Sequence, residues 1–228
     1  MNIFEKIKFI LKKPKAIIIT GNGRQRAKEA IFQILKPRLR IGEDVLIFET
    51  DLTNYSDREK AKFLIRHSSL PVLAVIHFDK DFSAGEKKDI VRSKKLAKNL
   101  PPYGHLILNF DDETAKRIKE EDNLKETTFG FQEGADFQVT DVKLNTQAQP
   151  SDKAGRRVEM NECSSTNGIN FKINYKGSIV PVWLTSEPDS DERARKEQIY
   201  SVMGAVVAGT VLGLNLVEIS NVLKSYPH

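Results

Sequence analysis

Short apolar runs alternate with longer charged segments of helical period through the first half of the chain. The apolar runs are typical of strands buried on both faces, and they cover residues 16–20, 45–48, 72–76, 105–109 and 127–129. The segments between them predict helices at residues 26–35, 56–67, 85–100 and 113–120. Strands that alternate with helices pair in parallel. This half therefore predicts a doubly wound, P-loop-like α/β sheet, with ligands at the carboxyl ends of its strands.

The pattern then changes to an alternation of apolar and polar positions, which is typical of strands with one buried face. Three such strands are predicted, at residues 136–144, 168–175 and 179–184. Lys176 and Gly177 form a turn, and the polar residues 145–156 predict a mobile hairpin loop. Two helices follow, at residues 192–212 and 216–225, with Gly213 as a helix stop and Asn215 as an N-cap. The second half therefore predicts an antiparallel β meander and two C-terminal helices.

We predict a single module over residues 1–228. Its parts are a linker helix (1–15), a parallel α/β core (16–130), an antiparallel β subregion (131–186) and closing helices (190–228). Hydrophobic residues make up 39% of the 228 residues, which is enough for a packed core. The one cysteine excludes an intrachain disulfide, and neither a secretory signal nor a membrane-spanning apolar run is visible. We expect a soluble, cytoplasmic protein.

The formal net charge is +5, but 36 basic residues are mixed with 31 acidic ones, so no nucleic-acid partner is expected. The densest basic cluster lies in residues 1–15, where it alternates with apolar residues to predict an amphipathic helix. Two interpretations stay open. The helix has a solvated basic face at the protein surface, or it makes a peripheral contact with a membrane or docks on a partner.

A glycine turn between the first strand and the first long helix is a candidate anion site, because free backbone N–H groups and the helix dipole favour phosphate there. The candidate residues are Gly21, Asn22, Gly23, Arg24, Gln25 and Arg26. A phosphate loop adds a lysine for the terminal phosphates and a hydroxyl for magnesium. Here Arg24 and Gln25 stand instead, so the glycines alone allow either a plain tight turn or a nucleotide site.

Carboxylates follow two other strands at the same sheet edge. Glu49 ends the second strand and is either a magnesium ligand or a solvated carboxylate. Asp111 and Asp112 follow the fourth strand and either bind metal or ribose, or cap the next helix. The histidines make no metal-spaced cluster with Cys163, and no catalytic residue can be assigned.

Taken in order, these segments resemble the central, ATP-binding domain of the Mur ligases, which use ATP to add amino acids or peptides to cell-wall precursors. Residues 19–29 are similar to the family phosphate loop, T-G-x-N-G-K-T-T-x-K-E, and residues 44–49 to the strand that ends in its magnesium glutamate. Further similar segments are V-L-N-x-D-D at 105–112, T-F-G at 128–130, A-D at 135–136 and the closing helices at 199–219. The resemblance implies ATP and Mg²⁺ as cofactors.

The departures from the family pattern predict a degenerate site. Arg24 stands at the loop lysine, Gln25 at the magnesium threonine, and His77 is not at the position of the family's metal-binding histidine. Lys94 falls near the lysine that the family carbamylates to bridge two magnesium ions, or is an ordinary surface lysine. The family's H-N pair falls on Glu197 and Gln198, and its later Asn on Ser201. We expect no counterpart of the amino- and carboxyl-terminal domains of the ligases in these residues.

Three hypotheses follow. The first is a degenerate Mur-ligase-like module that acts as a binding or scaffold protein, linked to cell-wall precursor synthesis. The second is an ATP- and Mg²⁺-dependent amide (peptide) ligase subunit, completed by a partner protein that supplies the missing domains. The third is a membrane-surface protein that docks through residues 1–15.

Overall fold

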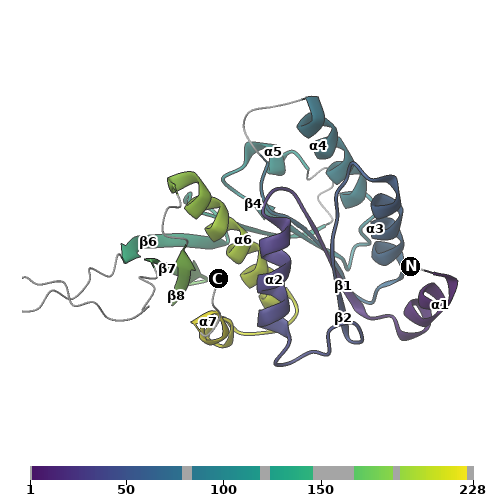
Figure 1. Ribbon diagram of the computed structural model, residues 1–228, viewed down its shortest axis with the longest axis horizontal. Coiled ribbons are helices and arrows are strands. Elements are labelled where there is room, and N and C mark those ends of the chain that lie inside the picture. Colours follow the sequence, from purple (N-terminus) through teal and green to yellow (C-terminus); the bar gives the residue numbers. More distant parts are fainter. Residues whose placement is uncertain (1, 79–83, 119–123, 146–166, 187–190, 225–228) are drawn as a thin grey trace, which may run out of the picture.

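The computed structural model describes residues 2–78, 84–118, 124–145, 167–186 and 191–224. One eight-stranded sheet runs through it in the order β2-β1-β3-β4-β5-β6-β7-β8 (Figure 1). The strands are β1 (Lys15–Thr20), β2 (Val45–Glu49), β3 (Pro71–Val75), β4 (His105–Asn109), β5 (Lys125–Gly130), β6 (Phe137–Asn145), β7 (Asn167–Tyr175) and β8 (Ser178–Ser186). The helices are α1 (Ile3–Lys12), α2 (Arg24–Leu35), α3 (Tyr55–His67), α4 (Ala84–Ala97), α5 (Glu113–Lys116), α6 (Glu192–Val211) and α7 (Leu216–Lys224).

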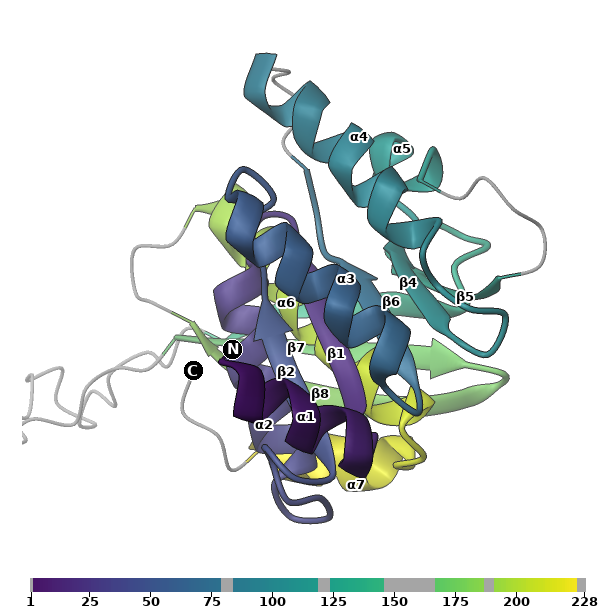
Figure 2. The same ribbon diagram turned by 90° about the vertical axis from the view of Figure 1, so that its right-hand side faces the viewer.

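Helices cover both faces of the parallel part of the sheet, as the continuous apolar strands predict. Successive side chains of β1 point to opposite faces: Ile17 and Ile19 join a core with α2, α6 and α7, whereas Ala16 and Ile18 join a core with α1, α3, α4 and α5. All four side chains are fully buried. The two helical layers can be seen on either side of the sheet in Figure 2. The predicted doubly wound α/β class is confirmed.

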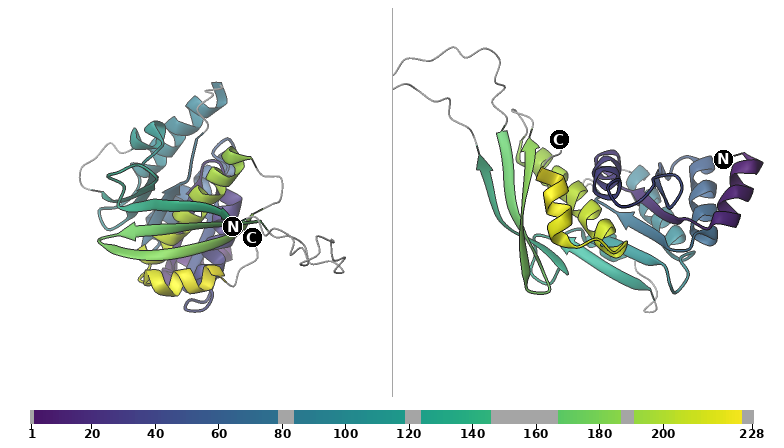
Figure 3. Two further views of the ribbon diagram at one scale, coloured as in Figure 1. Left: turned by 90° about the vertical axis from the view of Figure 1, so that its left-hand side faces the viewer. Right: turned by 90° about the horizontal axis from the view of Figure 1, so that it is seen from below.

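The sheet continues into the predicted antiparallel meander. The β6–β7 and β7–β8 pairs are antiparallel, and β6 also pairs with β5 in parallel, through Phe129↔Phe137 and Gly130↔Gln138. These two pairs join the predicted antiparallel subregion, 131–186, to the parallel core in one sheet. Figure 3 shows the three strands as an arm beside α6 and α7.

Helix α6 is the centre of the molecule. Its residues from Gln198 to Gly209 are buried, and it packs on α2 and on the parallel strands. A Cβ at Gly204 would lie 2.4 Å from Ile76 Cδ1, and one at Gly209 would lie 2.8 Å from Ile34 Cγ2, so both glycines let the helix approach closely. No helix in the described part of the chain is long and apolar enough to cross a bilayer.

Most predicted element boundaries hold within two or three residues. Gly213 has a φ of 99°, and Asn215 Oδ1 accepts from the Glu218 N–H, so the predicted helix stop and cap are both present. The helix predicted at 113–120 ends at Lys116, because its only turn is capped at both ends by local hydrogen bonds. Apart from Asn145, the hairpin loop predicted at 145–156 lies outside the described residues.

Candidate functional site

The glycine loop joins β1 to α2 at the carboxyl edge of the sheet, as predicted. Strand β1 ends at Thr20 and α2 begins at Arg24. Gly23 is the N-cap of α2 and supplies no side-chain cap, and the first helical turn holds no acidic residue. The amino end of α2, with its basic side chains, is therefore electrostatically suited to an anion.

Both loop glycines are required by packing inside the protein. Gly21 has a φ of +92°, and a Cβ there would lie 2.6 Å from the backbone oxygen of His77. Gly23 has a φ of +75°, and a Cβ there would lie 2.3 Å from Ser201 Oγ. The loop is thus held between the residue after β3 and the middle of α6, and these contacts explain the glycines without a ligand.

Polar groups of the loop bond within the chain. The Asn22 N–H donates to the His77 backbone oxygen at 2.7 Å, and the Arg24 guanidinium donates to the Gly21 oxygen at 3.4 Å. The Gln25 side-chain amide donates to Glu29 Oε1 at 3.5 Å, along the exposed side of α2. Gln25 therefore follows its own helix, and it brings no hydroxyl to the loop.

Glu49 lies beside the loop, where the sequence predicts it. It is the last residue of β2 and pairs with Ile19 of β1. Lys28 Nζ lies 3.8 Å from Glu49 Oε1, so a cation of the chain already stands next to the carboxylate. The other oxygen, Oε2, is buried and accepts no hydrogen bond from the described residues.

Lys94 stands in the last turn of α4, at the end that leads toward β4. Its role as a metal-site residue stays a prediction.

The loop fits an anion better than it fits a magnesium–nucleotide complex. Backbone geometry, the helix dipole and the basic side chains Arg24 and Arg26 all favour a phosphate. Magnesium prefers several oxygen ligands, but the hydroxyl position holds Gln25, and Glu49 faces Lys28. Within the residues that the structure describes, no group of three or more His, Cys, Asp or Glu side chains could hold a metal ion.

Of the three residues at the family's H-N and Asn positions, Glu197 lines a hollow at the first half of α6 and accepts from Arg193 at 3.3 Å, whereas Gln198 and Ser201 bond to other elements. The buried Gln198 amide donates to the Thr185 oxygen of β8 at 2.8 Å. Ser201 Oγ lies 2.9 and 3.2 Å from the backbone carbonyl oxygens of Glu197 and Gly23, and its one proton is donated between them. Both side chains tie α6 to its neighbours, in place of facing an open cleft.

A hollow of about 560 Å³ lies between the carboxyl ends of β3, β4 and β5 and the first half of α6. Its polar centre is the carboxylate of Asp111, which accepts the N–H groups of Phe131 and Gln132 and the hydroxyl of Tyr200, at 2.7–3.0 Å. Burial, and then the Asp111 carboxylate, raise the pKa of the Tyr200 hydroxyl, so Tyr200 stays a neutral donor. Asp111 therefore holds β5, the following loop and α6 together.

The neighbouring aspartate has the capping role that the sequence left open. Asp112 is the N-cap of α5 and accepts from the N–H groups of Thr114 and Ala115, while its second oxygen accepts from the Phe78 N–H at 2.8 Å. His77 Nδ1 lies 3.8 Å from the same oxygen. Tyr200 was missed by reasoning from the sequence, because it is 89 residues from Asp111 and stands in an apolar helix without a motif of its own.

The fold and the glycine loop together define the class: a P-loop-like α/β module whose sheet is extended by an antiparallel arm. No family model matches the chain, and no curated protein does. Solved structures give the particular likeness, which is to Mur ligases. MurF from Acinetobacter baumannii matches with a TM-score of 0.71 and 17% identity, over 98% of this chain and 49% of that one.

Two further ligases agree with this likeness. A pseudomurein peptide ligase type C from Methanothermus fervidus has a TM-score of 0.62 and 16% identity, over 99% of this chain and 52% of that one. MurF ligase from Thermotoga maritima, in complex with ADP, has a TM-score of 0.66 and 14% identity, over 95% and 50%. The chain therefore has a Mur-ligase-like fold, and it spans about half the length of the structures that it matches.

Proposed function

We propose that this chain is a Mur-ligase-like module that acts as a binding or scaffold protein, linked to cell-wall precursor synthesis, and that its phosphate loop serves its own packing. The observation that carries the proposal is the bonding of Arg24 and Gln25, which stand where the family has its ATP-binding lysine and its magnesium-binding threonine. Both Arg24 and Gln25 bond within the chain, to Gly21 and to Glu29. Contacts with the transferring phosphate are commonly worth a few kcal/mol each in the transition state, so their loss should abolish efficient turnover.

The surroundings of the loop support the same conclusion. Lys28 offsets the charge of Glu49, and Gly21 and Gly23 are closed in by His77 and Ser201. A magnesium ion at the Glu49 carboxylate would be repelled by the Lys28 ammonium, 3.8 Å from Oε1. An anion would still meet a basic helix end.

The alternative is an ATP- and Mg²⁺-dependent amide ligase subunit whose remaining parts a partner protein supplies. Two observations favour it: the amino end of α2 is basic and uncapped by a side chain, and Glu49 Oε2 has no hydrogen-bond donor among the described residues. In this alternative Arg24 would meet the phosphates and Glu49 a magnesium-bound water. The similar MurF ligase from Thermotoga maritima was solved in complex with ADP, which supports a nucleotide as a ligand in this alternative.

Calorimetry with ATP, with and without Mg²⁺, separates the two. We compare the unsubstituted chain with Arg24→Ala and Glu49→Gln, and use Lys36→Ala as the control, because exposed Lys36 stands at the opposite end of the same helix. The scaffold proposal predicts no magnesium-dependent heat at millimolar ATP. Magnesium-dependent binding that both site variants lose and the control keeps would overturn it in favour of the ligase subunit.

A further inference from the structure

Helix α1 displays most of its apolar surface to solvent. Its exposed side chains include Phe4 (80%), Leu11 (79%), Ile3 (69%) and Ile7 (51%). A helix of a soluble domain normally turns such residues toward the core. Here the one buried residue of α1 is Phe9, whose ring lies 5.7 Å from that of Phe63 on α3.

The angular positions of these residues show how α1 is seated. At 3.6 residues per turn, the side chains of Ile10, Ile3, Ile7, Leu11 and Phe4 fill an arc of about 120°. Phe9 lies roughly 160° from the middle of that arc. The helix therefore docks on α3 by the side opposite its apolar arc, and the arc points away from the protein.

Lysines border the arc on both sides. Lys6 and Lys8 each lie about 40° outside one of its two edges. A lysine at this position can run its apolar stem along the helix and keep its ammonium at a polar surface. An apolar arc between two lysine rims is the distribution of an amphipathic helix that lies in the headgroup region of a membrane.

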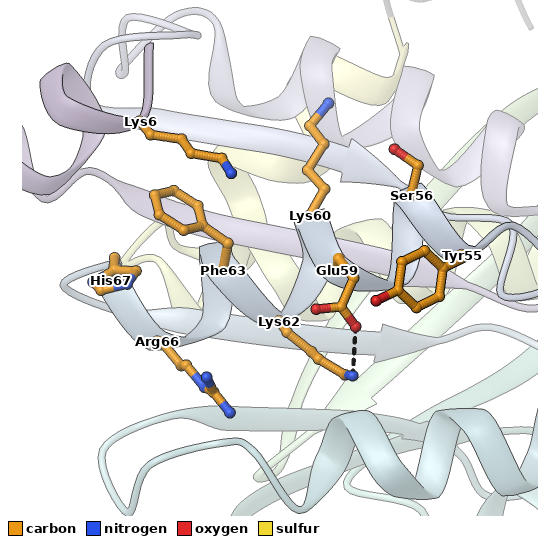
Figure 4. A pocket seen from close by; sticks show the side chains of 9 residues that line it. All are labelled: Lys6, Tyr55, Ser56, Glu59, Lys60, Lys62, Phe63, Arg66 and His67. Carbon is orange, nitrogen blue, oxygen red and sulfur yellow. Dashed lines mark hydrogen bonds and ion pairs between the residues drawn. The ribbon is translucent and has the colours of Figure 1, made fainter. Parts of the chain in front are cut away.

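Further basic groups lie next to Lys6 on α3. Lys6 Nζ stands 5.5 Å from the centre of the Phe63 ring, at one end of a hollow of about 440 Å³ between α1 and α3 (Figure 4). Lys60, Lys62 and Arg66 also line this hollow, and Glu59, the one acidic side chain among its lining residues, is paired with Lys62 at 2.7 Å. These groups lie on the α3 side of α1 and add positive charge to this end of the protein. The charges next to the arc itself are those of Lys6 and Lys8, which complement an anionic bilayer.

We propose that α1 binds the surface of an anionic lipid bilayer, with Phe4, Leu11 and their apolar neighbours in the headgroup region and the lysines at the phosphates. A second copy of the chain fits less well. Two identical arcs placed face to face would bring their lysine rims together, and Glu5 is the only acidic residue of the helix. This inference is independent of whether the glycine loop binds nucleotide.

Vesicle flotation tests the proposal on the whole chain, with vesicles of phosphatidylcholine alone or mixed with phosphatidylserine. Binding is expected on the mixed vesicles only, and it should weaken in high salt. The double variant Phe4→Ser/Leu11→Ser should lose at least about tenfold in affinity. Its control is Phe32→Ser/Val217→Ser, which removes two exposed apolar side chains from α2 and α7 and should bind normally.

The charge is tested in the same way. Lys6→Gln/Lys8→Gln should weaken binding to the mixed vesicles by about fivefold per lysine, whereas Lys36→Gln/Lys95→Gln, at exposed sites on other elements, should not. Circular dichroism verifies that each variant is folded. The proposal is overturned if the unsubstituted chain does not float with the mixed vesicles, or if both double variants of α1 float as it does. It is also overturned if sedimentation shows a dimer that Phe4→Ser/Leu11→Ser dissociates while the flotation of that variant is unchanged.

Discussion

Substitution of Gly21 by alanine tests whether the glycine loop is closed by the protein itself. At a φ of +92°, a residue with a Cβ carries about 1–2 kcal/mol of backbone strain. The new Cβ would also lie 2.6 Å from the His77 oxygen, which is backbone and cannot rotate away. Overpacking of this kind costs about 1–3 kcal/mol, so Gly21→Ala should lose about 2–5 kcal/mol of unfolding free energy.

Gly42 provides the matched control. It has almost the same backbone conformation, with a φ of +88°, but a Cβ there would meet nothing within 4 Å. Gly42→Ala should therefore lose only the strain, about 1–2 kcal/mol. For a chain of this size each kcal/mol lowers the melting temperature by about 2–4 °C.

Urea unfolding followed by circular dichroism measures both losses, and the difference between them isolates the contact with His77. We expect Gly21→Ala to be the less stable variant by about 1–3 kcal/mol. Equal losses, within about 0.5 kcal/mol, would refute the reasoning, because the loop would then have room for a side chain and would be open to a ligand.

Two further outcomes are expected. Gly23→Ala should be destabilising because its Cβ would lie 2.3 Å from Ser201 Oγ and because a residue with a Cβ is strained at a φ of +75°. Adding Ser201→Ala should relieve the contact, because the next atom lies at 3.6 Å, but not the strain. Urea unfolding of the single and double variants checks this, and additive losses would contradict it. Burial, and then the charge of Lys125, lower the pKa of the His105 imidazole below its usual value in the folded chain. The unfolded chain therefore binds the proton more readily. The free energy of unfolding should fall as the pH drops below about 6.5. Urea midpoints between neutral and mildly acidic pH should therefore shift less in His105→Gln than in the unsubstituted chain, and equal shifts would contradict this cause.

The order of elements could be predicted because each one carries its own local signal. The run at 16–20 is apolar from 16 to 19, which predicted a strand covered on both faces, and β1 has that environment. The alternation at 168–175 predicted one buried face, and Ile169, Phe171 and Ile173 form it. By contrast, the parallel pairing of β6 with β5 involves only two residue pairs, and no periodicity distinguishes it from an antiparallel start.

The candidate site was predictable only in its linear parts. The strand, glycine turn and helix start are neighbours in the chain, so Gly21 to Arg26 could be assigned to one loop, and Glu49 follows from parallel pairing with β1. The resemblance to the family also predicts Lys94 beside the metal, and this assignment stays a prediction, because it depends on how the last turn of α4 lies relative to Glu49.

The sequence by itself determined that this protein has a doubly wound sheet, a glycine turn at a helix start and a lysine-rich amphipathic first helix, because these depend on residues within a few positions of each other. Only the tertiary structure decided which residues those features contact and which of them face solvent. It closes the loop with His77 and Ser201, places Lys28 next to Glu49, and turns the apolar arc of α1 outward. The physical reason is that burial and charge pairing depend on distances across the fold, and these are set by how the helices pack on the sheet.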